Sequence, residues 1–531
     1  MLSQPQQFVN NLSKPKTLLL LGNILLVFFL ILFNNLKLIP LRPGDFLFFT
    51  FLALALALYR PGWCFLLFIG TIPLENIDLA PPQLGIAIRP YQFFGALAIL
   101  AIIIRLASQR LHFKLIKPVW YDWLVIILVL GGFLSIIAAP DKISSFRLSI
   151  IIGTFAALYY LVRNYIQNIE DLKKAIPFFL SSSVIVVSYG IWQNWAYLHN
   201  LASFEVMPGR ANATFTEPDW LGIYLVLLTG IAYTLIYYFQ LENGDTSKRI
   251  FNFQFSIYKF QIFNYLLLTA TFILLIITVS RSAWLGAFAV YAIFVSIFFI
   301  GSREERWKWK ETAKLKLKII SCLLISILLV YVFHLTNFQL FNRAESTGTG
   351  LQKITISCDQ NINLPEKIQN VSELGKYNCR FIKLEEIQSE KDQGKFVTEI
   401  YRSDPNVQTR SEIYQKSWEQ IRNHPILGIG WGSIGDILGK DERGAVLNSS
   451  NIFLETYLGA GILGFLALVI LLGYILIKSI KNYFYAENDL QKVINLFIII
   501  SWFAIIIPNL FNTGIFLGIF WVWIAVAQVK S

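Results

Sequence analysis

The sequence predicts an all-α polytopic membrane protein with about 12–14 transmembrane helices. Of its 531 residues, 55% are hydrophobic, which is more apolar sequence than the core of a soluble domain absorbs. Many apolar runs exceed about 18 residues, the length that spans the hydrocarbon of a bilayer. The net charge of +12 is concentrated in short loops between these runs, where Lys and Arg set the orientation of the spans. The charge therefore does not indicate a nucleic-acid partner.

Loop charge orients the predicted spans. The basic connections at 105–118, 163–174, 302–318 and 478–492 fall on one side, and both chain termini are then expected to be cytoplasmic. The first apolar run is expected to remain as a span, because no small-residue cleavage site follows it. The predicted spans are 17–35, 44–59, 61–76, 90–107, 119–138, 147–165, 176–195, 219–239, 263–280, 283–301, 318–335, 452–477, 494–509 and 513–528.

This topology divides the chain into three parts. Transmembrane helices with short loops are expected over 1–335, an external segment over 336–451 and C-terminal transmembrane helices over 452–531. The turn at Arg281 and the loop at 196–218 are then on the same face as the external segment. We expect a functional site to form where these three regions meet.

The first part of the external segment is expected to be a small insert. Residues 344–408 are polar and have little apolar periodicity, which predicts irregular or β-rich structure. Cys358 and Cys379 lie in this insert. They are a candidate disulfide if this face is oxidising, and two free thiols are the alternative.

Residues 409–423 predict an amphipathic helix that lies in the membrane interface. Thr409 and Glu412 have the spacing of a capping box, and aromatic and apolar residues recur at helical spacing after them. Arg410 would then follow the cap, where the positive end of the helix dipole and free amide groups attract an anion. A solvated arginine in the first turn is the alternative.

Arg281 is a charge in an apolar setting, since no other ionised side chain occurs between Asn264 and Ile300. At the centre of a bilayer an arginine costs about 2.5–3.5 kcal/mol. A turn between two spans would tolerate this charge, but Ser, Gly or Asn would make the same turn without it. We therefore predict that Arg281 binds an anion, and a lipid-linked phosphate at the outer face suits the guanidinium fork.

Four segments occur in an order that is typical of one group of membrane enzymes. They are GRANATFTEPDWLGIYL at 209–225, SRSAWLG at 280–286, TRSEIYQKSWEQIRNHPILGIGWGSIG at 409–435 and SSNIFLETYLGAGILG at 449–464. Together they resemble the O-antigen ligase and O-antigen polymerase superfamily of bacterial membrane glycan transferases. The first segment resembles that family's Arg-x-x-Gly-Thr-Phe-x-x-Pro-Asn pattern.

The resemblance implies a GT-C-like transferase in the bacterial inner (plasma) membrane, with its large loop in the periplasm. Such an enzyme moves a glycan from a polyprenyl diphosphate to an acceptor hydroxyl in surface polysaccharide biosynthesis, without a metal or another cofactor. By position, Arg281 and Arg410 match the two arginines expected to hold the diphosphate, and Arg210 is a third candidate. The implied partners are the lipid-linked glycan, the bilayer and other proteins of polysaccharide export and assembly.

The family's ligase motif, His-[Asn/Ser/Gln]-x9-Gly-x-x-[Gly/Thr/Tyr], is altered in this chain. Ser450 stands where the family has its basic histidine, whereas Asn451, Gly461 and Gly464 keep the spacing. A serine hydroxyl is not a base near neutral pH, and these two residues could simply cap the following helix. The remaining candidates for a base are His424, Glu217, Asp219 and Glu455. The candidates to bind substrate are Arg210, Asn451, Glu217 and Asp219.

Two functions remain open from the sequence. The first is a polysaccharide polymerase or ligase, and the missing histidine favours a polymerase or a divergent transferase. The second is an anion or bicarbonate transporter, or a non-catalytic accessory protein of the same family, in which the arginines line an anion path. A transporter usually has broken helices and inverted repeats, and neither is evident. No metal site is predicted, because Cys-x-x-Cys and His-rich spacings are absent.

Overall fold

Membrane-spanning helices make up most of the molecule. The structure, a computed structural model, describes residues 15–111, 115–207, 209–242, 257–301, 306–336, 340, 350–360, 364–369, 371–382, 387–403, 405–439 and 446–529. Within these ranges, 11 helices are long and apolar enough to cross a membrane. The prediction of an all-α polytopic membrane protein is therefore confirmed.

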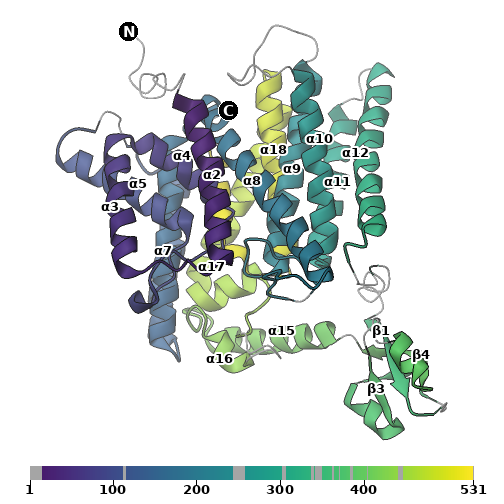
Figure 1. The fold of residues 1–531 in the computed structure, drawn as a ribbon. Coiled ribbons are helices and arrows are strands. Elements are labelled where there is room, and N and C mark those ends of the chain that lie inside the picture. Colours follow the sequence, from purple (N-terminus) through teal and green to yellow (C-terminus); the bar gives the residue numbers. More distant parts are fainter. Residues whose placement is uncertain are drawn as a thin grey trace.

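The long helices lie side by side in one bundle (Figure 1). Among the closest pairs, α17 packs against α6, and α18 packs against both α9 and α11. The bundle helices are α2 (Pro15–Asn35), α5 (Pro90–Ala107), α6 (Trp120–Ser135), α7 (Lys142–Tyr165), α8 (Ile169–Leu198), α9 (Pro218–Glu242), α10 (Ile257–Ile277), α11 (Arg281–Gly301), α12 (Arg306–Val332), α17 (Ile452–Phe484) and α18 (Asp489–Asn509).

Three of the fourteen predicted spans do not form helices of 18 residues or more. The helices α3 (Pro43–Tyr59) and α4 (Pro61–Thr71) are apolar but fall below the length of a full span. The last predicted span, 513–528, contains the 3-10 turn η5 (Gly514–Phe516) and α19 (Gly518–Val526). Nine residues of helix extend about 14 Å, roughly half the hydrocarbon thickness. Because every residue of α19 is buried, its apolar sequence serves packing inside the bundle, which hydropathy alone does not distinguish from lipid exposure.

The two ends of the bundle differ in what covers them. In Figure 1, α2 begins and the chain ends on the upper side, whereas α15 (Pro405–Asn423), α16 (Ile434–Leu438) and a small sheet lie on the lower side. We refer to this lower side as the α15 face. The connections at 199–217, 278–280 and 510–517 join helices on the same face. The predicted meeting of the Arg281 turn, the loop before α9 and the large external segment on one face is therefore observed.

A four-stranded sheet projects from the α15 face below α12 (Figure 1). Its strand order is β2-β4-β1-β3, in which β1 is antiparallel to β3 and β4 and β2 is parallel to β4. Cys358 and Cys379 are directly opposite each other on β1 and β3 and are joined by a disulfide bond. The strands are β1 (Leu351–Cys358), β2 (Lys367–Ile368), β3 (Cys379–Phe381) and β4 (Phe396–Ser403), with the short helices η3 (Val371–Tyr377) and α14 (Ile387–Asp392) between them.

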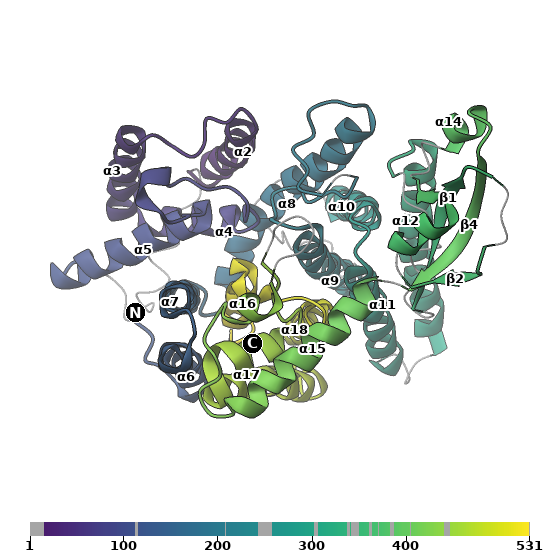
Figure 2. The same ribbon diagram turned by 90° about the horizontal axis from the view of Figure 1, so that it is seen from below.

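The helix α15 crosses the α15 face in front of α17 (Figure 2). It begins at Pro405, so the predicted start at Thr409 is wrong. Proline suits a first helical turn, because its fixed φ is helical and it lacks only an N–H that would be unpaired there. Arg410 consequently lies in the second turn of α15, and the predicted anion site at free amide groups next to it does not form.

Candidate functional site

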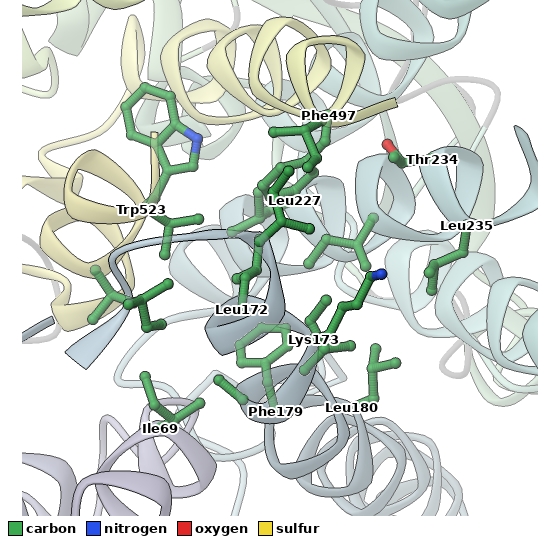
Figure 3. A pocket seen from close by; sticks show the side chains of 18 of the residues that line it. Ile69, Leu172, Lys173, Phe179, Leu180, Leu227, Thr234, Leu235, Phe497 and Trp523 are labelled. Carbon is green, nitrogen blue, oxygen red and sulfur yellow. The ribbon is translucent and has the colours of Figure 1, made fainter. Parts of the chain in front are cut away.

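One cavity of the bundle is apolar and does not contain the predicted site residues. It has a volume of about 170 Å³ and lies between α4, α8, α9, α18 and α19 (Figure 3). Side chains such as Leu227, Phe497 and Trp523 line it, and Lys173 is its one charged lining residue. It lies near the first turns of α8 and α18, at the end of the bundle remote from α15. The predicted polar residues lie instead at the opposite end of the bundle, on the α15 face.

The loop before α9 is a rigid support for Arg210. The side chain of Gln193 in α8 is fully buried, and its Oε1 accepts hydrogen bonds from the backbone N–H groups of Asn212 (3.2 Å) and Ala213 (2.8 Å). Its Nε2 donates to the carbonyl of Phe204 (3.1 Å). One buried amide therefore fixes both ends of the turn that carries Arg210.

Arg210 is itself held by three groups. Its Nε donates to the carbonyl of Thr278 (2.9 Å), and its Nη1 donates to the sulfur of Met207 (3.3 Å). Its Nη2 lies 3.3 Å from each carboxylate oxygen of Asp219. Asp219 lies in the first turn of α9, where the helix dipole favours a negative charge. Arg210 therefore joins the loop, the end of α10 and the start of α9.

Two serines connect Arg281 to its surroundings. Ser280 donates from its hydroxyl to Oδ1 of Asp219 (2.5 Å), and Ser282 accepts a hydrogen bond from Nδ2 of Asn512 (3.1 Å). Arg281, between the two serines, is the first residue of α11 and is half-buried. It is therefore placed where α9, α11 and the turn after α18 meet.

Arg410 approaches the same carboxylate from α15. Its guanidinium lies over the ring of Phe511, 5.3 Å from the ring centroid, and it interacts electrostatically with Asp219. Among the residues that the structure describes, none makes a hydrogen bond to this guanidinium. We refer to Arg210, Asp219, Arg281 and Arg410 as the arginine cluster.

The turn at 510–513, after α18, joins the arginine cluster to α15 and α17. The carbonyl of Leu510 accepts hydrogen bonds from Nδ2 of Asn451 (3.0 Å) and from the hydroxyl of Tyr414 (3.3 Å). The next two residues, Phe511 and Asn512, are the partners of Arg410 and Ser282 described above.

Sequence reasoning missed this turn. The turn contributes the carbonyl of Leu510, the ring of Phe511 and the amide of Asn512. None of these groups is charged, so none of them indicates a charged site in the sequence. The signal that could have found it is the pair Asn509 and Asn512 in the short link between two apolar runs. Both amides are buried and hydrogen-bonded, Asn509 to the N–H of Gly514 (2.7 Å).

The position of the family histidine lies at the start of α17. Asn451 is the N-cap, since its Oδ1 accepts from two backbone N–H groups of the first turn. Ser450 has a left-handed backbone (φ 50°), and its N–H donates to Oδ1 of Asn448 (2.9 Å). Glu455 is buried and accepts from the N–H (3.0 Å) and the hydroxyl (2.7 Å) of Ser449. The carboxylate of Glu455 therefore fixes the segment before the helix.

The other candidate bases differ in position. His424 is exposed at the far end of α15, about 21 Å from Arg410 along the helix axis, so the structure does not bring it to the arginine cluster. Glu217 is half-buried immediately before α9. Asp219 is the candidate whose hydrogen bonds place it within the cluster.

Glu205 is a further acidic residue of the loop before α9 that sequence reasoning did not single out. Its Oε2 accepts a hydrogen bond from the N–H of Gly209 (2.8 Å), and its Oε1 is buried without a partner among the described residues. Burial raises the pKa of this carboxyl to about 7. Because a substrate hydroxyl cannot reach a buried oxygen, we assign Glu205 to bracing the turn next to Arg210.

The helix α17 is interrupted at Gly461, where φ is 64°. The segment 426–430, after α15, fills the interruption. Two of its N–H groups donate to the carbonyl of Leu458 (2.8 and 3.0 Å), and Ile462 donates to the carbonyl of Ile426 (3.0 Å). A Cβ at position 461 would lie 2.3 Å from that last carbonyl oxygen, so only glycine fits. The motif glycine therefore fixes where the far end of α15 joins α17.

Comparison with known proteins identifies one family. Residues 265–469 match the model of the family described as O-Antigen ligase. No curated protein and no solved structure matches the chain. The matched residues include Arg281, Arg410 and Ser450, and the resemblance inferred from the sequence is confirmed over this part of the chain. Asp219 and Phe511 lie outside the match, on either side of it.

Proposed function

Because residues 265–469 match the O-antigen ligase family, we propose that this chain is a glycan transferase of the O-antigen ligase and polymerase superfamily. It moves a glycan from a polyprenyl diphosphate to an acceptor hydroxyl during surface polysaccharide synthesis. The reaction takes place at the arginine cluster. The α15 face is then the periplasmic face of the bacterial inner membrane, where the disulfide between Cys358 and Cys379 is chemically stable.

The observation that carries this proposal is the approach of Arg210 and Arg410 to one carboxylate, that of Asp219, beside Arg281. Arg281 and Arg410 are far apart in the sequence, yet the serines on either side of Arg281 bond to Asp219 and to Asn512, and Arg410 lies over Phe511 in the same turn at 510–513. The N–H groups of Arg410 are not engaged by the described residues. A guanidinium of this kind can bind two oxygens of a diphosphate at once.

The arrangement suits transfer from a diphosphate. The acceptor oxygen attacks the anomeric carbon while the bond from that carbon to the diphosphate oxygen breaks. Negative charge then accumulates on the departing diphosphate. Arg281 and Arg410 are already in place to stabilise this charge, so the protein does not need to reorganise during the reaction.

The anion-transporter alternative has less support. An interrupted helix such as α17 is typical of transporters, and sequence analysis did not detect it. Here, however, the backbone groups freed at Leu458 and Ile462 are hydrogen-bonded to the segment 426–430. The cavity inside the bundle is lined by apolar residues apart from Lys173 and Thr234, and so apolar a lining does not suit the path of an anion.

The proposal is tested by complementation of bacteria that lack the protein. Arg281→Ala and Arg410→Ala should fail to restore long-chain surface polysaccharide, because loss of one group that stabilises the leaving charge costs about 10²–10³ in turnover. Arg422→Ala is the matched control: Arg422 is on the same helix and also lies over a ring, that of Trp418 at 5.8 Å, but it is remote from the cluster.

Wild type and Arg422→Ala should both restore the polysaccharide. Restoration by Arg281→Ala and Arg410→Ala at normal expression would contradict the proposal. Loss of anion uptake with unchanged polysaccharide in the same strains would favour the transporter instead.

A further inference from the structure

This chain differs from the family pattern at two positions, and each difference adds or removes a side chain that can accept a proton. At position 450 the family has a histidine and this chain has Ser450. In the segment 209–225, the pattern ends in Pro-Asn, whereas this chain ends it in Pro218-Asp219. One departure removes a base and the other introduces a carboxylate.

We propose that Asp219 is the general base of the transfer reaction and replaces the missing histidine. This inference rests on the proposed function, because it assigns a residue to the deprotonation of the acceptor hydroxyl. It concerns a residue outside the part of the chain that matches the family.

The contacts connect the two altered positions. Asn451, next to Ser450, donates to the carbonyl of Leu510, and Asn512 in the same turn donates to Ser282. Two residues before Ser282, Ser280 donates to Asp219. The two altered positions therefore border the same polar cluster, and a base at either one can serve an acceptor bound between them.

The side chain of Asp219 is accessible and lies among groups that pair with a carboxylate. Its side chain is 27% exposed, in contrast to the buried Oε1 of Glu205 and the buried Glu455. Arg210 pairs with its carboxylate, Ser280 donates to it and Arg410 interacts with it electrostatically. These groups favour the charged form, which is the form that can accept a proton.

A carboxylate among cations is a weak base, and the reaction needs no stronger one. Diphosphate is a good leaving group, so its bond to the anomeric carbon breaks with the electron pair moving to the phosphate oxygen. The acceptor oxygen forms the new bond to that carbon and becomes acidic as it does so. Its proton then passes to a carboxylate oxygen of Asp219 and from there to water.

The test restores the family pattern in two steps. The full chain is reconstituted in vesicles with a polyprenyl-diphosphate-linked glycan and an acceptor glycan, and transfer and donor binding are both measured. Asp219→Asn, which is the residue of the family pattern, should lower turnover about 10²–10⁴-fold while donor affinity changes less than about twofold. Ser450→His alone should remain close to wild type, because histidine tolerates a left-handed backbone. In Asp219→Asn, adding Ser450→His should raise turnover at least tenfold.

Rescue by Ser450→His separates a base from a structural carboxylate, since a distant imidazole cannot rebuild the pair with Arg210. Wild-type turnover in Asp219→Asn would overturn the inference. The inference would also be overturned if Ser450→His alone is active but the double variant is no faster than Asp219→Asn. A loss of donor binding large enough to explain the lost turnover would overturn it as well.

If Ser450→His fails to fold, Asp219→Glu is the deciding variant. Its turnover should be at least tenfold faster than that of Asp219→Asn, and equal rates would overturn the inference. A wild-type chain that binds the donor and transfers nothing would instead overturn the proposed function.

Discussion

Arg210 and Arg410 approach the same carboxylate from different parts of the chain, and they are held in different ways. Arg210 is 13% exposed and donates to a carbonyl, a thioether and Asp219. Arg410 rests on the ring of Phe511 without a hydrogen bond from the described residues. The guanidinium of Arg210 is therefore committed to groups of the protein, whereas the guanidinium of Arg410 can still bind a ligand. It also argues against Arg210 as a third diphosphate-binding residue.

Among Arg410, Arg210 and the ring under Arg410, the largest effect on transfer is expected at Arg410. Arg410→Lys keeps the charge but loses the planar fork that binds two oxygens and stacks on a ring. Transfer in vesicles should fall roughly 10- to 100-fold, the value of one charge-assisted hydrogen bond. The melting temperature, measured on the same preparation, should not change. An unchanged transfer rate would mean that Arg410 acts only as a point charge.

A smaller effect on transfer, and a larger one on stability, is expected at Arg210. Arg210→Gln removes the ion pair with Asp219 and leaves the carbonyl of Thr278 without its donor. The free energy of unfolding should fall by about 1–3 kcal/mol, measured by thermal unfolding in detergent against Arg422→Gln as the control. If the variant keeps its melting temperature and loses donor binding, Arg210 contacts the donor, and the distinction between a structural Arg210 and a ligand-binding Arg410 is wrong.

The smallest effect is expected at Phe511. Phe511→Leu removes the ring under Arg410, and a cation–π contact at a partly exposed site contributes about 0.5–1 kcal/mol. Donor affinity should therefore weaken about 2- to 5-fold, and Phe511→Trp should recover it. Equal affinities for the leucine and tryptophan variants would show that the ring does not position Arg410.

Most of the bundle could be predicted from the sequence, because a membrane-spanning helix needs a long apolar run and little else. The error at α19 shows the limit of that rule. Its residues 518–526 are as apolar as a lipid-facing span, but they are all buried inside the protein. Hydropathy predicts that a segment is shielded from water, but it does not predict whether protein or lipid surrounds the segment.

The site residues that could be predicted are those whose charge is isolated in an apolar part of the sequence. Arg281 could be singled out because it is isolated in an apolar stretch. Asp219 could be named only as one of several acids near helix ends, since Glu217 and Asp219 both flank Pro218. Its role depends on Arg210, Ser280 and Arg410, whose positions are set by three-dimensional packing.

The start of α15 illustrates a different limit. The spacing of Thr409 and Glu412 satisfies a capping rule, but the helix continues back to Pro405. A capping pattern states which residues are able to end a helix, and it does not require the helix to end there. The prediction for Arg410 consequently rested on a wrong position in the helix, although the residue is in the cluster for another reason.

The helix α15 is held at its middle and beyond its C-terminal end. The hydroxyl of Tyr414, the central residue of the helix, donates to the carbonyl of Leu510, and the segment 426–430 is hydrogen-bonded into α17 after the helix ends. The sheet stops at Ser403, just before this helix starts. A force on the sheet would therefore reach the half of α15 that carries Arg410 before the half that is joined to α17, so the position of the insert and that of Arg410 are mechanically coupled.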